Sequence, residues 1–98
     1  MKLDKSQTRQ LKALAHPLKP VVLIGQKGLT ESVLEEIERA LHDHELIKIK
    51  LAALREEREE LATSIAGKTH SHVIAITGGI AILFKRNTKK PKVVLKGV

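Results

Sequence analysis

The feature that most constrains the fold is a regular alternation of two kinds of apolar segment. Stretches with apolar residues at helical spacing alternate with short apolar runs that are too brief for a helix. The sequence predicts helices over 6–15, 30–41 and 55–66, and strands over 21–24, 46–51, 73–77 and 80–84. Strands separated by helices favour parallel pairing, and a final hairpin adds an antiparallel strand. The order α-β-α-β-α-β-β therefore predicts a compact α/β domain with a four-stranded mixed sheet.

Local signals add detail to this outline. Thr30 is a suitable N-cap for the second helix, and Gly67 is the predicted C-cap of the third. A Gly-Gly pair at 78–79 suits the two-residue turn of the closing hairpin. The β-branched run 21–24 is expected to be a buried strand. Residues 93–95 are expected either to add a short edge strand or to trail off.

The chain's composition limits both its core and its ligands. With 98 residues it is long enough for one domain, predicted over 1–98 with a basic tail from about residue 87. Phe84 is the only aromatic residue, so the core must be aliphatic and there are no rings on which nucleic-acid bases could stack. Without cysteine there are no disulfides or thiolate sites. No signal peptide or membrane span is evident, and we expect a cytoplasmic protein.

Charge is distributed unevenly along the chain. Residues 1–30 carry six basic side chains against one acid, residues 31–60 hold ten of the eleven acids, and residues 61–98 carry seven basic side chains and no acid. If the two basic ends meet in the fold, the molecule will have one side that attracts a polyanion and one that repels it. A basic protein that is merely soluble is the alternative interpretation.

A Gly-x-x-Gly segment at residues 25–28 lies between a predicted strand and a predicted helix. Glycine lets a ligand approach the main chain closely, and the N–H groups at a helix start can bind a phosphate. Lys27 adds a full charge to the loop. Two glycines at this spacing also occur in purely structural turns, so the motif alone leaves both interpretations open. Neither a dinucleotide-binding nor a Walker motif is present.

Metal and catalytic chemistry have little support. His42 and His44 do not share a helix face, and His70 and His72 could form a metal pair only with a third ligand that the acid-free residues 61–98 do not offer. Glu and Arg alternate over 55–60, which is typical of a solvated, ion-paired helix face. The sequence predicts no metal, no cofactor and no enzymatic activity.

Longer motifs resemble a known family. The segment 11–30 contains His-Pro-Leu-Lys-Pro, an apolar run and the Gly-x-x-Gly loop, and it resembles the start of the CRM domain, the chloroplast RNA splicing and ribosome maturation module. The helix 33–41, the strand 45–50 and the hairpin ending at Phe84-Lys85-Arg86 continue the likeness. Over residues 3–88 the chain is similar to the stand-alone bacterial form, the YhbY family.

The resemblance implies a fold like the C-terminal domain of translation initiation factor three. It also implies RNA binding through a loop like that of KH domains, and association with precursors of the large ribosomal subunit. Many relatives carry two basic residues in this loop, whereas one of those positions is Gln26 here. A ribosome-associated monomer is expected. The predicted RNA contacts are the loop and the basic residues expected around it: Gly25, Gln26, Lys27, Gly28, Lys12, Lys19, Lys85 and Arg86.

Two further hypotheses come from other classes of function. The Glu-rich second and third helices favour a protein-interaction adapter that docks a basic ribosomal protein. Binding of double-stranded DNA is less favoured, because no predicted helix has a basic recognition face.

Overall fold

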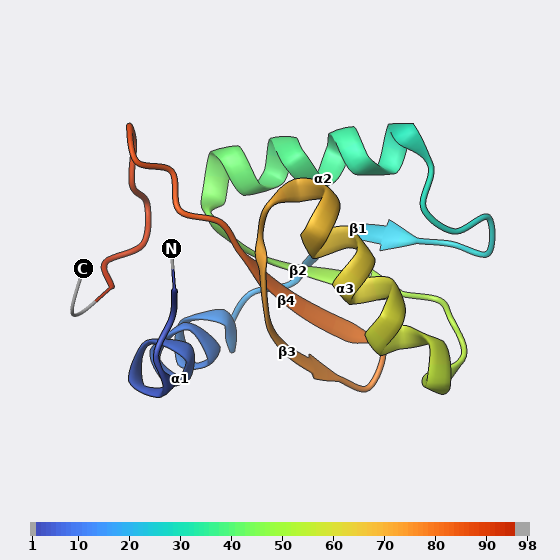
Figure 1. Ribbon diagram of the computed structural model, residues 1–98, viewed down its shortest axis with the longest axis horizontal. Helices are drawn as coiled ribbons and strands as arrows, with labels where there is room; N and C mark the ends of the chain where they lie inside the picture. The colour runs from blue at the N-terminus through green and yellow to red at the C-terminus, as the bar shows by residue number, and fades with distance from the viewer. Residues whose placement is uncertain (1, 96–98) are drawn as a thin grey trace.

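The computed structural model describes residues 2–95, which fold as three layers (Figure 1). A four-stranded mixed sheet lies between helix α1 on one face and helices α2 and α3 on the other. The predicted α/β class and the order of elements are confirmed. The elements are α1 (Lys5–Ala15), β1 (Pro20–Ile24), α2 (Glu31–His44), β2 (Leu46–Leu51), a 3-10 helix η1 (Arg55–Glu57), α3 (Arg58–Thr69), β3 (His72–Thr77) and β4 (Ile80–Phe84).

The strands are ordered β1-β2-β4-β3 across the sheet. β1 and β2 are parallel, as predicted, while β4 pairs antiparallel with both β2 and β3. The closing hairpin therefore places its second strand in the middle of the sheet, so β3 is an edge strand and not a neighbour of β2. Burial explains this order, since residues 81–84 of β4 are all buried while β3 is half-buried along most of its length.

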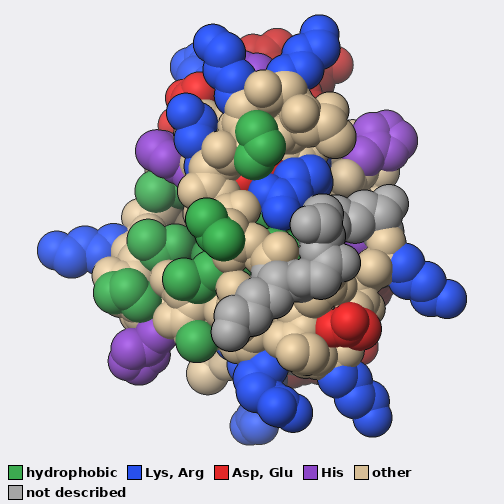
Figure 2. Space-filling view, turned by 90° about the vertical axis from the view of Figure 1, so that its left-hand side faces the viewer, with side chains coloured by type: hydrophobic (Ala, Val, Ile, Leu, Met, Phe, Trp, Pro, Cys, Tyr) green, Lys and Arg blue, Asp and Glu red, His purple; other side chains and the backbone are tan. Residues whose placement is uncertain are grey.

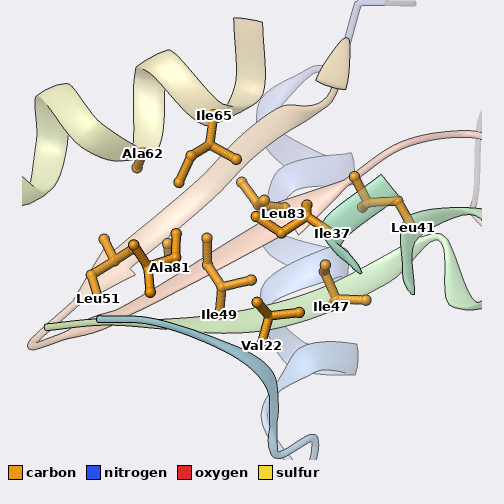
Figure 3. Close-up of a cluster of buried hydrophobic side chains, with 11 residues drawn as sticks. Val22, Ile37, Leu41, Ile47, Ile49, Leu51, Ala62, Ile65, Ala81 and Leu83 are labelled. Atoms are coloured by element: carbon orange, nitrogen blue, oxygen red, sulfur yellow. The ribbon is translucent and has the colours of Figure 1, made fainter. Parts of the chain in front are cut away.

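Each face of the sheet has its own apolar cluster, because side chains alternate along a strand. Ile47, Ile49 and Leu51 of β2 face α2 and α3 and pack against Ile37, Leu41, Ala62 and Ile65 (Figure 3). The opposite face brings together residues of α1, β2, β3, β4 and the C-terminal segment: Leu11, Ala15, Leu46, Ile74, Ile82, Phe84 and Leu95.

β1 differs from its prediction as a buried strand. Val22 and Ile24 are buried, but Val21 and Leu23 are 51% and 59% exposed. The strand lies at the edge of the sheet, and α1 packs on β2, β3 and β4. The outward side chains of β1 therefore remain open to solvent.

α3 also differs, because it continues past Gly67, the predicted C-cap. The helix ends at Thr69, and His70 closes it in the left-handed conformation with φ 57°. Thr69 is buried, and its hydroxyl donates to the carbonyl of Ile65 (2.9 Å). Burial of Thr69 thus favours another turn of helix over a stop at the glycine.

Helix α1 and the C-terminal segment lie together in the fold. This is the arrangement that a molecule with one basic side and one acidic side requires. Gln10 Nε2 donates to the carbonyl of Val94 (3.0 Å), and Leu95 is buried against α1. Residues 93–95 form no strand, and the burial of Leu95 shows that they do not trail off either. The acids of residues 31–60 lie mainly on α2, η1 and α3, across the sheet from α1.

Candidate nucleic-acid interface

The Gly-x-x-Gly loop leads from β1 into α2 and exposes its backbone. The N–H of Gly28 donates to the carbonyl of Gly25 (3.0 Å), and Gly28 has φ 75°, a conformation that favours glycine. Thr30 caps α2 as predicted, because its hydroxyl accepts a hydrogen bond from the N–H of Val33 (3.2 Å). A side chain added at either glycine would meet no atom within 4 Å, so a ligand can reach the main chain there.

The surroundings of this loop are acidic. A groove of about 460 Å³ lies between the loop and the start of α3, and its lining includes Gly25, Gln26, Glu57 and Glu60. The N–H of Ala52 donates to the carbonyl of Ile24 (3.0 Å) and ties the β2–η1 connection to the base of the loop. Lys27 is exposed at the loop tip, but the adjoining carboxylates oppose its attraction for phosphate.

The other predicted basic contacts do not surround the loop. The loop follows Ile24, which pairs with Leu51 at the end of β2, whereas Lys85 follows Phe84, which pairs with Leu46 at the start of β2. Lys19 precedes β1 and so also lies at the far end, about 20 Å from Gly25 at about 3.3 Å per residue of strand. Lys12 is exposed on α1. The expectation of one cluster around the loop was wrong, because sequence proximity does not report the end of a strand at which a side chain lies.

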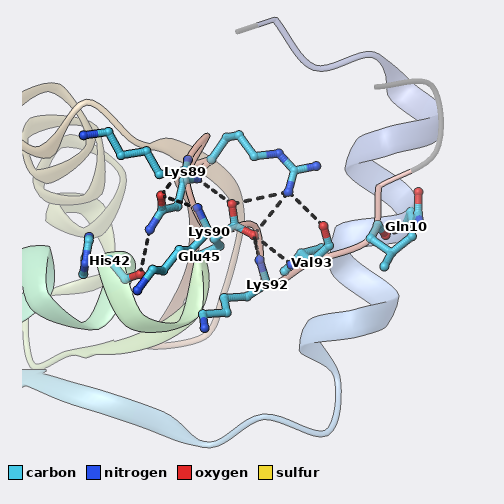
Figure 4. Close-up of polar contacts among 10 residues, drawn as sticks. Gln10, His42, Glu45, Lys89, Lys90, Lys92 and Val93 are labelled. Atoms are coloured by element: carbon cyan, nitrogen blue, oxygen red, sulfur yellow. Dashed lines mark hydrogen bonds and ion pairs between the residues drawn. The ribbon is translucent and has the colours of Figure 1, made fainter.

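A different basic surface forms around Glu45, between α2 and β2. Glu45 is fully buried, and its carboxylate accepts hydrogen bonds from the backbone N–H groups of Asn87 (2.5 Å), Lys92 (2.5 Å) and Val93 (2.7 Å). The guanidinium of Arg86 pairs with the same carboxylate (3.2 Å) and donates to the carbonyl of Val93 (2.8 Å). Figure 4 shows these contacts converging on one side chain. We call Glu45 and its contacts with these residues the clamp, and residues 85–93 the clamped segment.

The ionisation of Glu45 reflects this environment. Burial raises the pKa of the carboxyl, but the hydrogen bonds from Asn87, Val93 and Lys92 and the charge of Arg86 lower it by more, so the pKa is below its ordinary value. The carboxylate is therefore charged at neutral pH and holds the segment in place.

Within the clamped segment, Asn87 fixes the positions of its basic neighbours. The Asn87 side-chain oxygen accepts hydrogen bonds from the N–H groups of Lys89 and Lys90 (both 3.1 Å), and its nitrogen donates to the carbonyl of His42 (3.3 Å). The side chains of Lys89, Lys90 and Lys92 are exposed. The backbone that carries them is ordered before any ligand arrives, so less conformational entropy is lost on binding.

Lys19 reaches the same end of the molecule. Lys48 Nζ donates to the carbonyls of His16 and Leu18 (both 3.1 Å) and so fixes the turn that leads to Lys19. Lys19 and Lys92 line one groove. Figure 2 shows Lys and Arg side chains at the top, at the centre and around the edge of this side of the molecule. We define the basic end as Lys19, Lys85, Lys89, Lys90 and Lys92.

Sequence reasoning missed the clamp. Arg86 was predicted to contact RNA, yet its side chain is only 14% exposed and forms an ion pair with Glu45. Its guanidinium carbon lies over the Phe84 ring, 5.7 Å from the ring centroid. Glu45 was counted only as one of the ten acids of residues 31–60, with no separate role. One sequence signal did indicate burial of Glu45, because this residue directly precedes a strand whose first residues, Leu46 and Ile47, are apolar.

The histidines offer no metal centre in the structure. Across residues 2–95, no three histidine or carboxylate side chains are grouped closely enough to hold a metal ion. His70 is exposed, and burial lowers the pKa of the half-buried His72. None of the helices within these residues combines the length and apolar character that a membrane span needs.

Comparisons with known proteins agree on one family. The family model described as the CRS1 / YhbY (CRM) domain matches residues 3–85. Probable RNA-binding protein PA4753 of Pseudomonas aeruginosa is 43% identical over 94% of this chain and 89% of its own length. A Haemophilus influenzae protein named RNA-binding protein is 45% identical over 85% of each chain. The solution structure of SAV1595 from Staphylococcus aureus, described as a candidate RNA-binding protein, superposes with a TM-score of 0.84 at 26% identity over 96% of this chain and 99% of its own.

Proposed function

This chain belongs to the CRS1 / YhbY (CRM) domain family, and we propose that it binds structured ribosomal RNA by holding the phosphate backbone at its basic end. The observation that carries the proposal is the clamp, in which a buried carboxylate orders a segment that presents Lys89, Lys90 and Lys92 to solvent. Lysines bind phosphate as point charges, and a fixed backbone lowers the entropy lost on binding. The names of the relatives support RNA as the ligand.

The wider role that we propose is non-enzymatic. The chain would act as a cytoplasmic monomer that associates with precursors of the large ribosomal subunit during assembly. The family likeness and the separation of charge support this role, because a particle rich in RNA attracts the basic end and repels the acidic layer of α2 and α3. Crosslinking in cells, followed by sequencing of the attached RNA, tests it. Recovery of large-subunit precursor RNA is the expected result, and recovery of unrelated RNAs alone contradicts the assignment.

We also propose that the loop at 25–28 is a second backbone contact, made by Gly25, Gln26, Lys27 and Gly28. Lys27→Ala should weaken binding and reduce the slope of log affinity against log salt by about 0.7–0.9, the value for one phosphate contact. Gly28→Asp should weaken binding further, because it places a carboxylate where phosphate would approach. Titration of a fluorescent ribosomal RNA fragment at several salt concentrations measures both effects.

Gly28→Asn is the matched control for Gly28→Asp. Asparagine tolerates the left-handed conformation about as well as aspartate and adds no charge, so both variants carry similar backbone strain at φ 75°. If Gly28→Asp binds RNA as tightly as Gly28→Asn, the loop does not contact phosphate.

An adapter function is a second candidate, favoured by the position of the acidic side chains. Glu56, Glu57, Glu59 and Glu60 are all exposed on η1 and α3, where they could dock a basic ribosomal protein. Under our proposal, changing these four residues to glutamine does not weaken association with ribosomal particles in a sedimentation assay. Loss of association in this variant, with RNA affinity intact, would favour the adapter. Competition between duplex DNA and ribosomal RNA tests the third hypothesis, and we expect RNA to compete more strongly.

A further inference from the structure

An apolar groove lies at the basic end, beside the clamped segment and away from the loop at 25–28. It has a volume of about 610 Å³ and runs between α1, the start of β1, the start of β2 and the C-terminal segment. Its aliphatic walls include Leu14, Leu18, Val21 and Val94, which are 43%, 39%, 51% and 85% exposed. Figure 2 shows hydrophobic side chains gathered on this side of the molecule, with Lys, Arg and His around them. Exposed apolar residues that gather in one place commonly mark a binding site.

The polar part of the lining has one sign of charge. Lys19 and Lys92 lie at the groove together with His44, and none of the described residues that line it is acidic. Both lysines have fixed backbones, since Lys92 N–H donates to Glu45 (2.5 Å) and Lys48 holds the carbonyl of Leu18 just before Lys19 (3.1 Å). The complementary ligand therefore combines an apolar surface with negative charge.

We propose that this groove takes one unpaired nucleotide of the bound RNA, with its base against the aliphatic walls and its phosphates on Lys19 and Lys92. The inference rests on the proposed function and adds a site for a base to the backbone contacts. Proteins that recognise single-stranded RNA usually stack its bases on aromatic rings. Phe84 is the chain's one aromatic residue and is fully buried, so an aliphatic surface is what the chain offers to a base. The clamped segment contributes Lys92 to the groove, which makes the groove continuous with the proposed phosphate contacts.

The test combines a groove variant with RNA that lacks single bases. The double variant Leu14→Ser/Val94→Ser removes apolar surface without changing charge, and Leu54→Ser is the control, because Leu54 is a leucine 63% exposed outside the groove. The probes are a single-stranded oligouridine of about eight nucleotides and a series in which each position in turn is abasic. We expect one abasic position to weaken wild-type binding about tenfold, a loss that corresponds to about 55 Å² of apolar surface that is no longer buried.

The groove variant should bind the intact oligonucleotide about tenfold more weakly, because it loses apolar contact with the base, and it should be insensitive to the abasic position. Its salt slope should match the wild type, because no phosphate contact is lost. The control should behave as the wild type throughout. Thermal unfolding checks that the variants fold, and Val94→Ser alone, at a position 85% exposed, provides a second variant that leaves the core untouched.

Three results would overturn the inference. The groove variants could bind the intact oligonucleotide as tightly as the wild type, or every abasic position could be tolerated equally. An acidic leucine-containing peptide could perturb the methyl resonances of Leu14 and Val94 where the oligonucleotide does not, which would assign the groove to a protein partner. If the proposed function itself is wrong, the wild-type protein will also fail to bind structured ribosomal RNA. That result distinguishes failure of the proposed function from failure of the groove inference.

Discussion

Replacing Glu45 with glycine should destabilise the protein by about 1–4 kcal/mol, although its backbone conformation favours glycine. Glu45 has φ 62° and ψ −43°, a sparsely populated conformation in which a non-glycine residue is strained by about 1–2 kcal/mol, and glycine relieves that strain. The substitution also leaves the nearly buried Arg86 guanidinium and three backbone N–H groups without their acceptor, which costs about 3–5 kcal/mol. The loss outweighs the gain. Urea denaturation at neutral pH measures the difference.

His70 supplies the matched control for this prediction. It also has a positive φ, 57°, although its ψ of 40° places it in the left-handed α region and Glu45 lies outside that region; the His70 side chain is exposed. His70→Gly should therefore stabilise the protein by up to about 1 kcal/mol, because it relieves strain and leaves the clamp intact. Opposite signs for the two glycine substitutions would show that the carboxylate, and not the backbone, explains why glutamate occupies position 45. Stabilisation by both substitutions would contradict the clamp.

The stability difference between the wild type and Glu45→Gly should also depend on pH. The Glu45 carboxyl has a lowered pKa in the folded state and an ordinary value, about 4.3, when unfolded. Below that ordinary value the unfolded state binds more protons than the folded state. The contribution of the carboxylate is therefore fully present above about pH 4.3 and is lost as pH falls through the lowered folded pKa. Denaturation curves between neutral and acid pH should converge for the two proteins.

The second large effect concerns RNA affinity. Changing Lys89, Lys90 and Lys92 together to alanine should weaken binding of a ribosomal RNA fragment by at least about tenfold near physiological salt. If each lysine contacts one phosphate, the salt slope should also fall by about 2–2.7 in total. These side chains are exposed, so the free energy of unfolding should change little. Anisotropy titrations at a series of salt concentrations give the affinity and the slope together.

A control with the same loss of charge separates contact from general attraction. Arg39, Lys50 and Lys68 are exposed basic residues on α2, β2 and α3, outside the basic end. Their triple alanine variant carries the same net charge as the clamped-segment variant. Long-range attraction should weaken equally in both, but only the clamped-segment variant should lose phosphate contacts. Equal losses in the two variants would show that net charge alone explains the binding.

Local patterns were sufficient for much of the fold. The alternation of Leu46-Ile47-Lys48-Ile49-Lys50-Leu51 correctly predicted a strand with Ile47, Ile49 and Leu51 facing the core. The Thr30 cap and the hairpin turn at 78–79 were also confirmed, because such signals lie within a few residues of the structure that they specify.

Long-range contacts account for what the sequence did not show. The clamp joins Glu45 to residues that follow it by 41 to 48 positions in the sequence, and no local pattern reports such a contact. The order of β3 and β4 depended on which strand of the hairpin buries more apolar surface on both faces. The division between the loop at 25–28 and the lysines at the far end of the sheet followed from strand register. Each of these features was decided by tertiary packing.

An NMR titration of isotope-labelled protein with a large-subunit ribosomal RNA fragment tests whether RNA binds at the basic end. We expect the largest backbone amide shifts in the clamped segment and at Lys19, with smaller shifts in the loop at 25–28. Glu56 of η1 and Glu59 of α3, which do not line the groove beside the loop, should remain unaffected. Shifts confined to the loop and α3, with none between residues 85 and 93, would contradict binding at the basic end.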